Sequence, residues 1–240
     1  MKLDILVIAV HPDDAELGCA GTILKHIAEG KKVGVVDLTQ GELGTRGTIE
    51  TRYAEAEEAS KILGLSVREN LKLRDGFFKN DEEHQLKVIS AIRKYKPEII
   101  IANAMEDRHP DHGRASNLVN DSVFLSGLRM IETHSNGVLQ EPHRPNMLLH
   151  FIQDYYIKPD IVVDITPYWN QKLEAVQAYK TQFFNPTYKA DEPQTYISKP
   201  EFIQIIEGRA REFGKSIQTD FAEGFTCRRV LGVDSLFSLR

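Results

Sequence analysis

The chain of 240 residues has few of the features that mark secreted, membrane or nucleic-acid-binding proteins. It has only two cysteines, Cys19 and Cys227, so no disulfide framework is possible and we expect reduced thiols in a cytoplasmic protein. No apolar run approaches the roughly 20 residues that span a bilayer, and the first residues lack the apolar region of a signal peptide. The net charge is −5 with no block of Lys or Arg, which argues against nucleic acid as the main partner.

The composition is that of a globular protein, with 41% hydrophobic and 27% charged residues. A chain of this length can bury one sizeable core. We therefore expect a single domain over residues 1–240, with a core in residues 1–130 and completing strands and helices in residues 131–240.

Strand-like and helix-like segments alternate along the first half of the chain. Short runs rich in β-branched residues predict strands at residues 3–10, 32–38, 69–73 and 98–102, and later at 147–153 and 160–165. Amphipathic patterns predict helices at residues 17–29, 48–63, 82–95, 111–128, 168–182 and 200–216. This alternation predicts an α/β fold, a Rossmann-like three-layer domain with a mostly parallel sheet and a C-terminal elaboration.

The first predicted strand runs directly into His11-Pro12-Asp13-Asp14. In doubly wound sheets, ligands bind beyond the carboxyl ends of the strands, so this loop is in the right place for a site. An imidazole and a carboxylate three residues apart suit zinc, with iron(II) as a second choice. The second carboxylate could act as a general base. The alternative is that His11 caps the turn and the Asp pair caps the following helix.

A second cluster follows the fourth predicted strand, in residues 106–112, where four of seven residues are His or Asp. If the sheet has the order 3-2-1-4, the loops after strands one and four face each other. His11, Asp14 and His112 can then converge on one metal, and three protein ligands leave a position open for water. His109 remains as a second imidazole, which Asp111 could orient and keep protonated.

The remaining histidines lie outside any such cluster, and we interpret them as surface or packing residues. They are His26, His84, His134, His143 and His150. Cys19 falls within the first predicted helix, where packing is its expected role.

The two His clusters also carry a family signature. The run from His11 to Thr22 together with His109-Pro110-Asp111-His112 resembles the LmbE-like, or PIG-L-type, de-N-acetylase family over nearly the whole chain. The helix that starts after the Gly-rich loop and the segments at residues 178–182 and 222–225 resemble further motifs of that family. Ala15 stands where some members carry Glu. The chain is most similar to the branch that deacetylates an N-acetylglucosaminyl malate in bacillithiol biosynthesis.

The resemblance implies a role for each motif residue. It implies His11, Asp14 and His112 as zinc ligands and Asp13 as general base. It implies His109, with Asp111 behind it, as the positively charged partner of the oxyanion and a possible general acid. It implies Arg52 as a substrate-binding residue, with Arg108 as a weaker candidate. The activity implied is that of an amide hydrolase, which releases acetate from an N-acetylglucosaminyl compound.

Other readings of the same residues stay open. Two histidines and a carboxylate also occur in iron(II) oxygenases, and a sugar-binding protein with a structural metal would need no base at Asp13. The substrate could instead be another N-acetylglucosaminyl compound or a thiol conjugate. The partners we expect are a small amino-sugar substrate and further copies of the chain, with neither nucleic acid nor a membrane.

Overall fold

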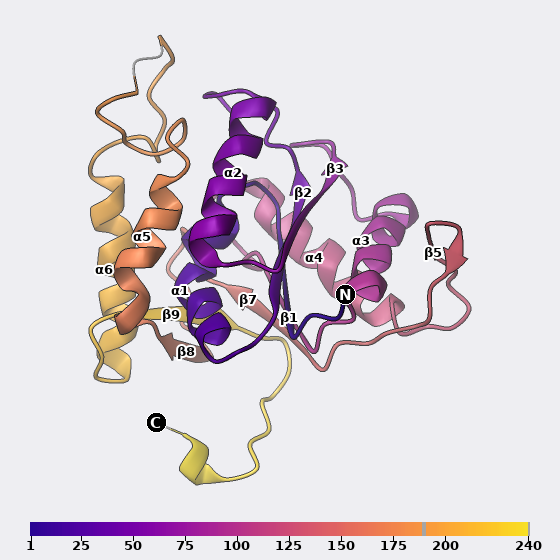
Figure 1. The fold of residues 1–240 in the computed structure, drawn as a ribbon. Coiled ribbons are helices and arrows are strands. Elements are labelled where there is room, and N and C mark those ends of the chain that lie inside the picture. The colour runs from indigo at the N-terminus through magenta and orange to yellow at the C-terminus, as the bar shows by residue number, and fades with distance from the viewer. Residues whose placement is uncertain (189–190, 240) are drawn as a thin grey trace.

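A seven-stranded sheet forms the middle of the computed structural model, which describes residues 1–188 and 191–239 (Figure 1). The strands lie in the order β3-β2-β1-β4-β7-β9-β8. Their bounds are β1 Ile5–Ala9, β2 Val33–Thr39, β3 Val67–Leu73, β4 Ile99–Ala102, β7 Met147–Phe151, β8 Ile161–Asp164 and β9 Ala222–Thr226. Pairing is parallel from β3 through β7, and β9 runs antiparallel to both of its neighbours. The mostly parallel sheet predicted from the sequence is therefore confirmed.

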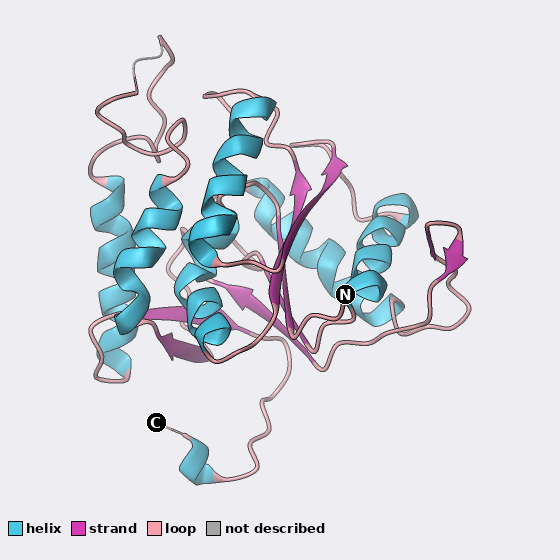
Figure 2. Ribbon diagram, viewed as in Figure 1, coloured by secondary structure: helices cyan, strands magenta, loops and turns pink. Residues whose placement is uncertain are grey.

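Helices cover both faces of this sheet, which gives the three expected layers (Figure 2). One face carries α1 (Asp14–Ala28), α2 (Ile49–Leu63), α5 (Trp169–Gln177) and α6 (Phe202–Ser216). The other face carries α3 (Glu82–Tyr95) and α4 (Pro110–Leu125). Smaller elements are the hairpin of β5 (His134–Ser135) and β6 (Val138–Leu139), and the 3₁₀ turns η1 (Thr166–Tyr168) and η2 (Leu236–Ser238). No helix among the described residues is long and apolar enough to cross a bilayer.

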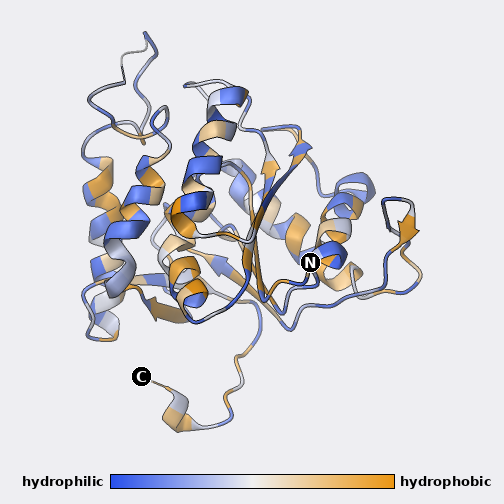
Figure 3. Cartoon of the chain, in the orientation of Figure 1, coloured by the Kyte–Doolittle hydropathy of each residue, from blue (hydrophilic) through white to orange (hydrophobic). Residues whose placement is uncertain are grey.

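The core lies on the two faces of the sheet, because the central strands are apolar on both sides. All five residues of β1 are buried, as expected for a parallel strand covered by helices on each face. Successive β1 residues point to opposite faces. Leu6 belongs to the apolar cluster under α3 and α4, and Val7 belongs to the cluster under α1. Figure 3 shows hydrophobic residues concentrated on the strands and on the helix faces toward them.

The strand order places two loops side by side at the site. β1 pairs in parallel with β4, with Ile5 opposite Ile99 and Ile8 opposite Ala102, so the two strands end level with each other. The loop after β1 leads into α1, and the loop after β4 leads into α4. The predicted order 3-2-1-4 is confirmed, and the two His clusters face each other as that order requires.

Helix α1 contains a break that could not be predicted from its sequence. The backbone at Cys19 leaves the helical region (φ −148°), so the amides after it lose their intrahelical partners. The Glu223 carboxylate of β9 accepts hydrogen bonds from Gly21 N (2.9 Å) and Thr22 N (2.7 Å). Lys172 of α5 binds the same carboxylate (2.6 Å) and donates to the carbonyl of Leu17 (2.9 Å). A buried ion pair thus restores the hydrogen bonds at the break.

Candidate active site

The loop after β1 presents its residues in an unusual backbone conformation. Asp14 is the first residue of α1, and its Oδ2 accepts a hydrogen bond from His11 N (3.0 Å). Asp13 has φ 138°, a region that residues other than glycine rarely adopt and that costs about 1–3 kcal/mol. The Asp13 side chain makes no cap hydrogen bond to α1. Asp13 thus occupies the N-cap position of α1, but capping does not account for its side chain.

The loop after β4 brings two more imidazoles to the same place. His109 is the N-cap of α4 and Pro110 is the next residue, a position where proline favours helix initiation. His112, one turn into the helix, has Nε2 3.3 Å from Asp14 Oδ1, and His11 Nδ1 lies 3.4 Å from Asp14 Oδ2. The three predicted ligands thus meet, with Asp14 between the two histidines.

These donors fit a divalent metal ion. Ring nitrogens of His11, His109 and His112 lie within 4.8 Å of one another, and imidazole with carboxylate is a donor set that zinc accepts. Burial alone would lower the pKa of both His11 and His112. Asp14 and the hydrogen bond to Asp75 instead raise the pKa of His11 to about 10. Asp14 and the hydrogen bond to Asp107 raise the pKa of His112 to about 9. Burial opposes ionisation of Asp14, but His112 and His11 hold its pKa well below its usual range. The pocket therefore favours positive charge beside an ionised Asp14.

Each of the two histidines is oriented by a carboxylate that the sequence did not single out as part of the site. His11 Nε2 lies 3.1 Å from Asp75 Oδ1, in the loop after β3, which leaves Nδ1 toward Asp14. His112 Nδ1 lies 2.7 Å from Asp107 Oδ2, which leaves Nε2 toward Asp14. Carboxylates behind ligating histidines fix the tautomer and ring orientation in metal sites.

Two buried amides hold the Asp14 carboxylate itself. Gln153, just after β7, donates to Oδ1 (2.6 Å), and Asn103, just after β4, donates to Oδ2 (3.0 Å). Asn103 in turn accepts from the backbone N–H of Val10 (2.9 Å). The oxygens of Asp14 are therefore fixed from the ends of three neighbouring strands.

Asp13 faces Arg52 rather than the metal-binding cluster. Arg52 is 6% exposed; its Nη1 donates to Asp13 Oδ2 (2.8 Å) and to the Pro12 carbonyl, and its Nη2 donates to Gln182 Oε1 (2.7 Å). Burial raises the pKa of Asp13 while the Arg52 charge opposes the rise, and the result is a pKa of about 6. Arg52 also lines the cavity, and its Nε has no hydrogen-bond partner among the described residues, so its role in substrate binding stays a prediction.

His109 is held differently from the prediction. Its Nδ1 accepts a hydrogen bond from Asp111 N (3.3 Å), so a neutral ring carries its proton on Nε2. Among the described residues, the Asp111 carboxylate bonds instead to Gly76 N (2.8 Å) and to Arg114. Burial and the charges of His11 and His112 lower the pKa of His109. The Asp111 carboxylate therefore makes no hydrogen bond to His109, and its charge only partly opposes the lowering of the His109 pKa.

The cluster opens into a cavity of about 500 Å³. Asp13, Asp14, His109 and His112 lie at its wall, and Arg108 lines it as well. The Arg108 side chain is 47% exposed. Its guanidinium lies 4.9 Å from the centre of the Tyr196 ring, and its Nε lies 3.4 Å from Asp154 Oδ2. Arg108 is therefore the predicted substrate-binding residue with a guanidinium open to solvent.

Comparison with known proteins identifies the family. The model of PIG-L, described as GlcNAc-PI de-N-acetylase, matches residues 6–123, which contain both His clusters. The chain belongs to the PIG-L family.

Two relatives that match most of the chain are deacetylases by name, and one solved structure shares the fold. Diacetylchitobiose deacetylase of Thermococcus kodakarensis is 29% identical over 92% of this chain and 81% of its own. A probable N-acetyl-α-D-glucosaminyl L-malate deacetylase 2 of Bacillus anthracis is 25% identical over 75% of this chain and 81% of its own. The crystal structure of a conserved protein from Thermus thermophilus superposes with a TM-score of 0.85 and 37% identity, covering 97% of this chain and 98% of the other.

Membership of the PIG-L family makes the protein an enzyme, a deacetylase of a metal-dependent family. The structure brings together all eight residues predicted from the sequence around one cavity or directly behind it. Sequence reasoning missed the supporting residues Asp75, Asn103, Asp107 and Gln153, and it assigned Gln182 only to a family motif. Asp107 lay within the quoted His/Asp cluster, but only the fold shows which nitrogen of His112 it binds.

Proposed function

We propose that this PIG-L protein is a zinc-dependent hydrolase that removes the acetyl group from an N-acetylglucosaminyl compound. The observation that carries the proposal is the pairing of two adjacent carboxylates with opposite environments. Asp14 lies between two imidazoles with a pKa well below its usual range, while Asp13 has a pKa of about 6. Because the pKa values of the two carboxyl groups differ in this way, Asp14 suits a metal ligand and Asp13 suits a general base.

The chain's residues have distinct roles in this proposal. His11, Asp14 and His112 would hold the ion, which supplies a Lewis acid for a water and the scissile carbonyl. Asp13 accepts the proton of the attacking water, and Arg52 keeps its carboxylate in place. His109 donates a hydrogen bond from Nε2 to the acetamide oxygen as negative charge develops there. The amine leaves with the proton that Asp13 has accepted from the water, and the products are acetate and a free amino sugar.

Zinc is proposed over iron(II) because of the donor set. Two imidazoles and one carboxylate with an open position are typical of catalytic zinc. Iron(II) tolerates the same donors, so metal analysis of the purified protein distinguishes the two. Activity that survives strict exclusion of oxygen would separate a hydrolase from an oxygenase.

For the aglycone we propose L-malate as the first candidate, which rests on the similarity to the probable malate deacetylase. Two arginines line the cavity, and we propose Arg108 as the main contact of a malate carboxylate because its side chain is the more exposed, while Arg52 is buried and bonded to Asp13 and Gln182. Phe77, 68% exposed, and Tyr196 line the same cavity and could equally pack on a second sugar ring. The similarity to a diacetylchitobiose deacetylase makes that sugar the necessary comparison.

The test is acetate release from N-acetylglucosaminyl L-malate, diacetylchitobiose and N-acetylglucosamine by the zinc-loaded enzyme. We expect the highest kcat/KM for the malate compound, and Arg108→Ala should lower it about 10- to 100-fold, as expected for a lost charge-assisted hydrogen bond. Arg129→Ala, an exposed arginine outside the cavity lining, is the matched control. A preference for diacetylchitobiose would overturn the malate proposal and leave the deacetylase. No acetate from any of the three substrates would contradict the proposed function itself.

A further inference from the structure

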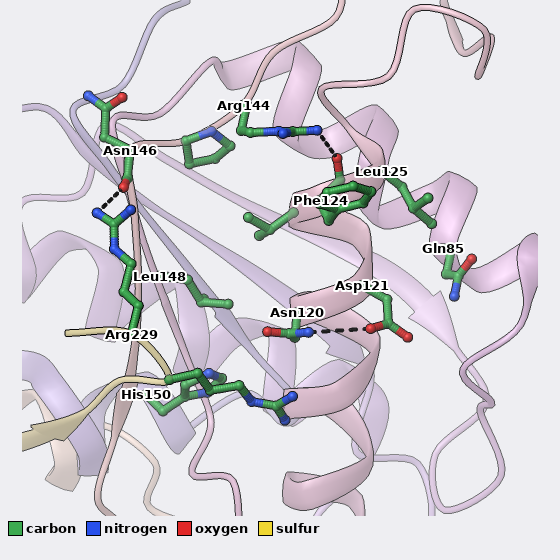
Figure 4. A pocket seen from close by; sticks show the side chains of 13 residues that line it. Gln85, Asn120, Asp121, Phe124, Leu125, Arg144, Asn146, Leu148, His150 and Arg229 are labelled. Atoms are coloured by element: carbon green, nitrogen blue, oxygen red, sulfur yellow. Dashed lines mark hydrogen bonds between the residues drawn. The ribbon is translucent and has the colours of Figure 1, made fainter.

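A second and larger cavity, of about 650 Å³, lies away from the active site. It is formed by α4, by Gln85 of α3, by β7 with the segment before it, and by the chain that follows β9 (Figure 4). Among the described residues it shares no lining side chain with the active-site cavity. Whatever it binds would therefore not compete for the substrate's contacts.

Three arginines line this cavity without a carboxylate partner. Arg144 donates to the Phe124 carbonyl (2.8 Å), Arg228 to Asn117 Oδ1 (2.9 Å) and Arg229 to the Asn146 carbonyl (2.6 Å). All of these acceptors are neutral, and in the described part of the chain no Asp or Glu lies within ion-pair distance of the three guanidinium groups.

Among the described residues, the cavity has a single acidic lining residue, and its carboxylate already accepts two hydrogen bonds. Asp121 accepts hydrogen bonds from the side-chain amides of Asn80 (2.7 Å) and Asn120 (3.3 Å), the second of which is drawn in Figure 4. Three cations against one acid is a local excess of positive charge on a chain whose net charge is −5. Guanidinium groups in a concave surface favour an anion, carboxylate or phosphate in particular.

The cavity also contains a buried acceptor without a partner. His150 of β7 is 1% exposed, and its Nδ1 donates to the carbonyl of Asn103 (2.8 Å). Nε2 is then a bare acceptor, and no described group donates to it. Burial and the nearby charge of Arg228 lower the pKa of His150, which keeps the ring neutral. Buried polar atoms are normally hydrogen-bonded, so this nitrogen calls for a hydroxyl or N–H from a bound molecule.

Apolar side chains form another part of the lining, beside the neutral polar Gln85, Asn120 and Asn146. Val123, Phe124 and Leu125 of α4 lie opposite Pro145 and Leu148. Small-molecule sites typically have such a wall with a few convergent polar groups.

We propose that this cavity binds a small organic anion, a carboxylate or phosphate, that also carries a hydroxyl group on an apolar body. The anion pairs with the arginines, the hydroxyl donates to His150 Nε2, and the body packs on Leu148 and the α4 side chains. The sequence offered no sign of such a site, because His150 stands alone in it and the arginines come from distant segments.

The experiment measures binding of matched probes to the intact, zinc-loaded enzyme by calorimetry and NMR. The first probe is 4-(hydroxymethyl)benzoate; its neutral counterpart is 4-(hydroxymethyl)benzamide, and 4-methylbenzoate lacks the hydroxyl. The para geometry keeps the carboxylate and hydroxyl too far apart to chelate a metal ion together. We expect the first probe to bind most tightly, and 4-(hydroxymethyl)phenyl phosphate shows whether the site prefers phosphate. Equal binding of the acid and its amide would overturn the proposal.

Variants locate the site and test each contact. Arg228→Ala with Arg229→Ala should weaken binding of the first probe about 10- to 100-fold, while Arg129→Ala, an exposed arginine outside the lining, should not. His150→Asn keeps a donor for the Asn103 carbonyl and removes Nε2, so it should abolish the preference for the hydroxyl probe. His112→Ala should leave binding intact. Loss of binding in His112→Ala would place the probe at the metal centre and contradict the proposal, and should His150→Asn fail to fold, the comparison of probes on wild type still decides.

Discussion

At the scale of single residues, the protonation state of Asp13 is set by two opposing effects. Burial favours its neutral form, and the Arg52 guanidinium 2.8 Å away favours the carboxylate. A base must be ionised to accept a proton, so activity should fall as the pH drops through the pKa of Asp13. Arg52 therefore acts as a positioning residue that also extends the active pH range downward.

Replacing Arg52 by Gln should move the acidic limb of the kcat/KM profile to higher pH. The reason is that removing the guanidinium takes away the charge that lowers the pKa of Asp13. The pH profiles of wild type, Arg52→Gln and the charge-retaining Arg52→Lys, all zinc-loaded, check this, with the lysine variant expected in between. A limb that stays in place, with kcat/KM lost only for an anionic substrate, would show instead that Arg52 reads the aglycone.

The orientation of His112 depends on Asp107, whose hydrogen bond to Nδ1 leaves Nε2 for the metal. Asp107→Asn should weaken zinc binding about 10- to 100-fold, the usual effect of losing a carboxylate behind a ligating histidine. Competition with a chromogenic chelator measures this, with Glu106→Gln as control because Glu106 is the exposed neighbour. Equal zinc affinity in the two variants would mean that Asp107 does not orient His112. Its carboxylate would then serve only to accept hydrogen bonds from the backbone N–H groups of Asp154 and Tyr155.

At the scale of elements, the broken helix α1 explains why β9 and α5 are needed beside the site. Glu223 and Lys172 supply the hydrogen bonds that the backbone loses around Cys19. Both side chains are 3% exposed. Since α1 begins at Asp14, this ion pair holds the helix that carries the metal-binding carboxylate.

Glu223→Ala should destabilise the protein by about 3–5 kcal/mol, because it leaves a buried ammonium and two amides unpaired. The double variant Glu223→Ala/Lys172→Met should recover part of that loss, since it removes the unpaired charge. Urea unfolding of the metal-free proteins measures both. The exposed pair Glu207–Arg211 is the control, and Glu207→Ala should change stability by less than about 1 kcal/mol. A similar small effect at Glu223 would contradict the proposed role of the ion pair.

Elements with a strong periodic pattern were predictable, and those that depend on distant partners were not. The helix expected at residues 82–95 is α3 with the same bounds, capped by Asp81. Strand β9 was missed because its short sequence, Ala-Glu-Gly-Phe-Thr, combines a charged residue with a glycine. All five residues are buried, and the charge of Glu223 is tolerated there because it pairs with α1 and α5. The helix predicted over residues 168–182 ends at Gln177, and the next residues turn so that Gln182 can reach Arg52.

At the scale of the whole molecule, topology accounts for what could be known of the site in advance. Residues that follow neighbouring parallel strands must meet at one edge, so His11, Asp14 and His112 could be placed together from the sequence. Which nitrogen faces which oxygen depends on side-chain directions, so the roles of Asp75 and Asp107 could not. The single domain over residues 1–240 and self-association stay predictions; exposed apolar residues after β9, such as Val230 and Phe237, would be natural places to look for contacts between copies.

The central claim is that two adjacent carboxylates divide metal binding and proton transfer between them. The most direct test measures bound zinc and acetate release on the same preparations of Asp13→Asn and Asp14→Asn. Asp13→Asn should keep one zinc per chain and lose about 10²- to 10⁴-fold in kcat, as for a missing general base, while Asp14→Asn should lose the zinc. Zinc lost from Asp13→Asn but retained in Asp14→Asn would contradict the account.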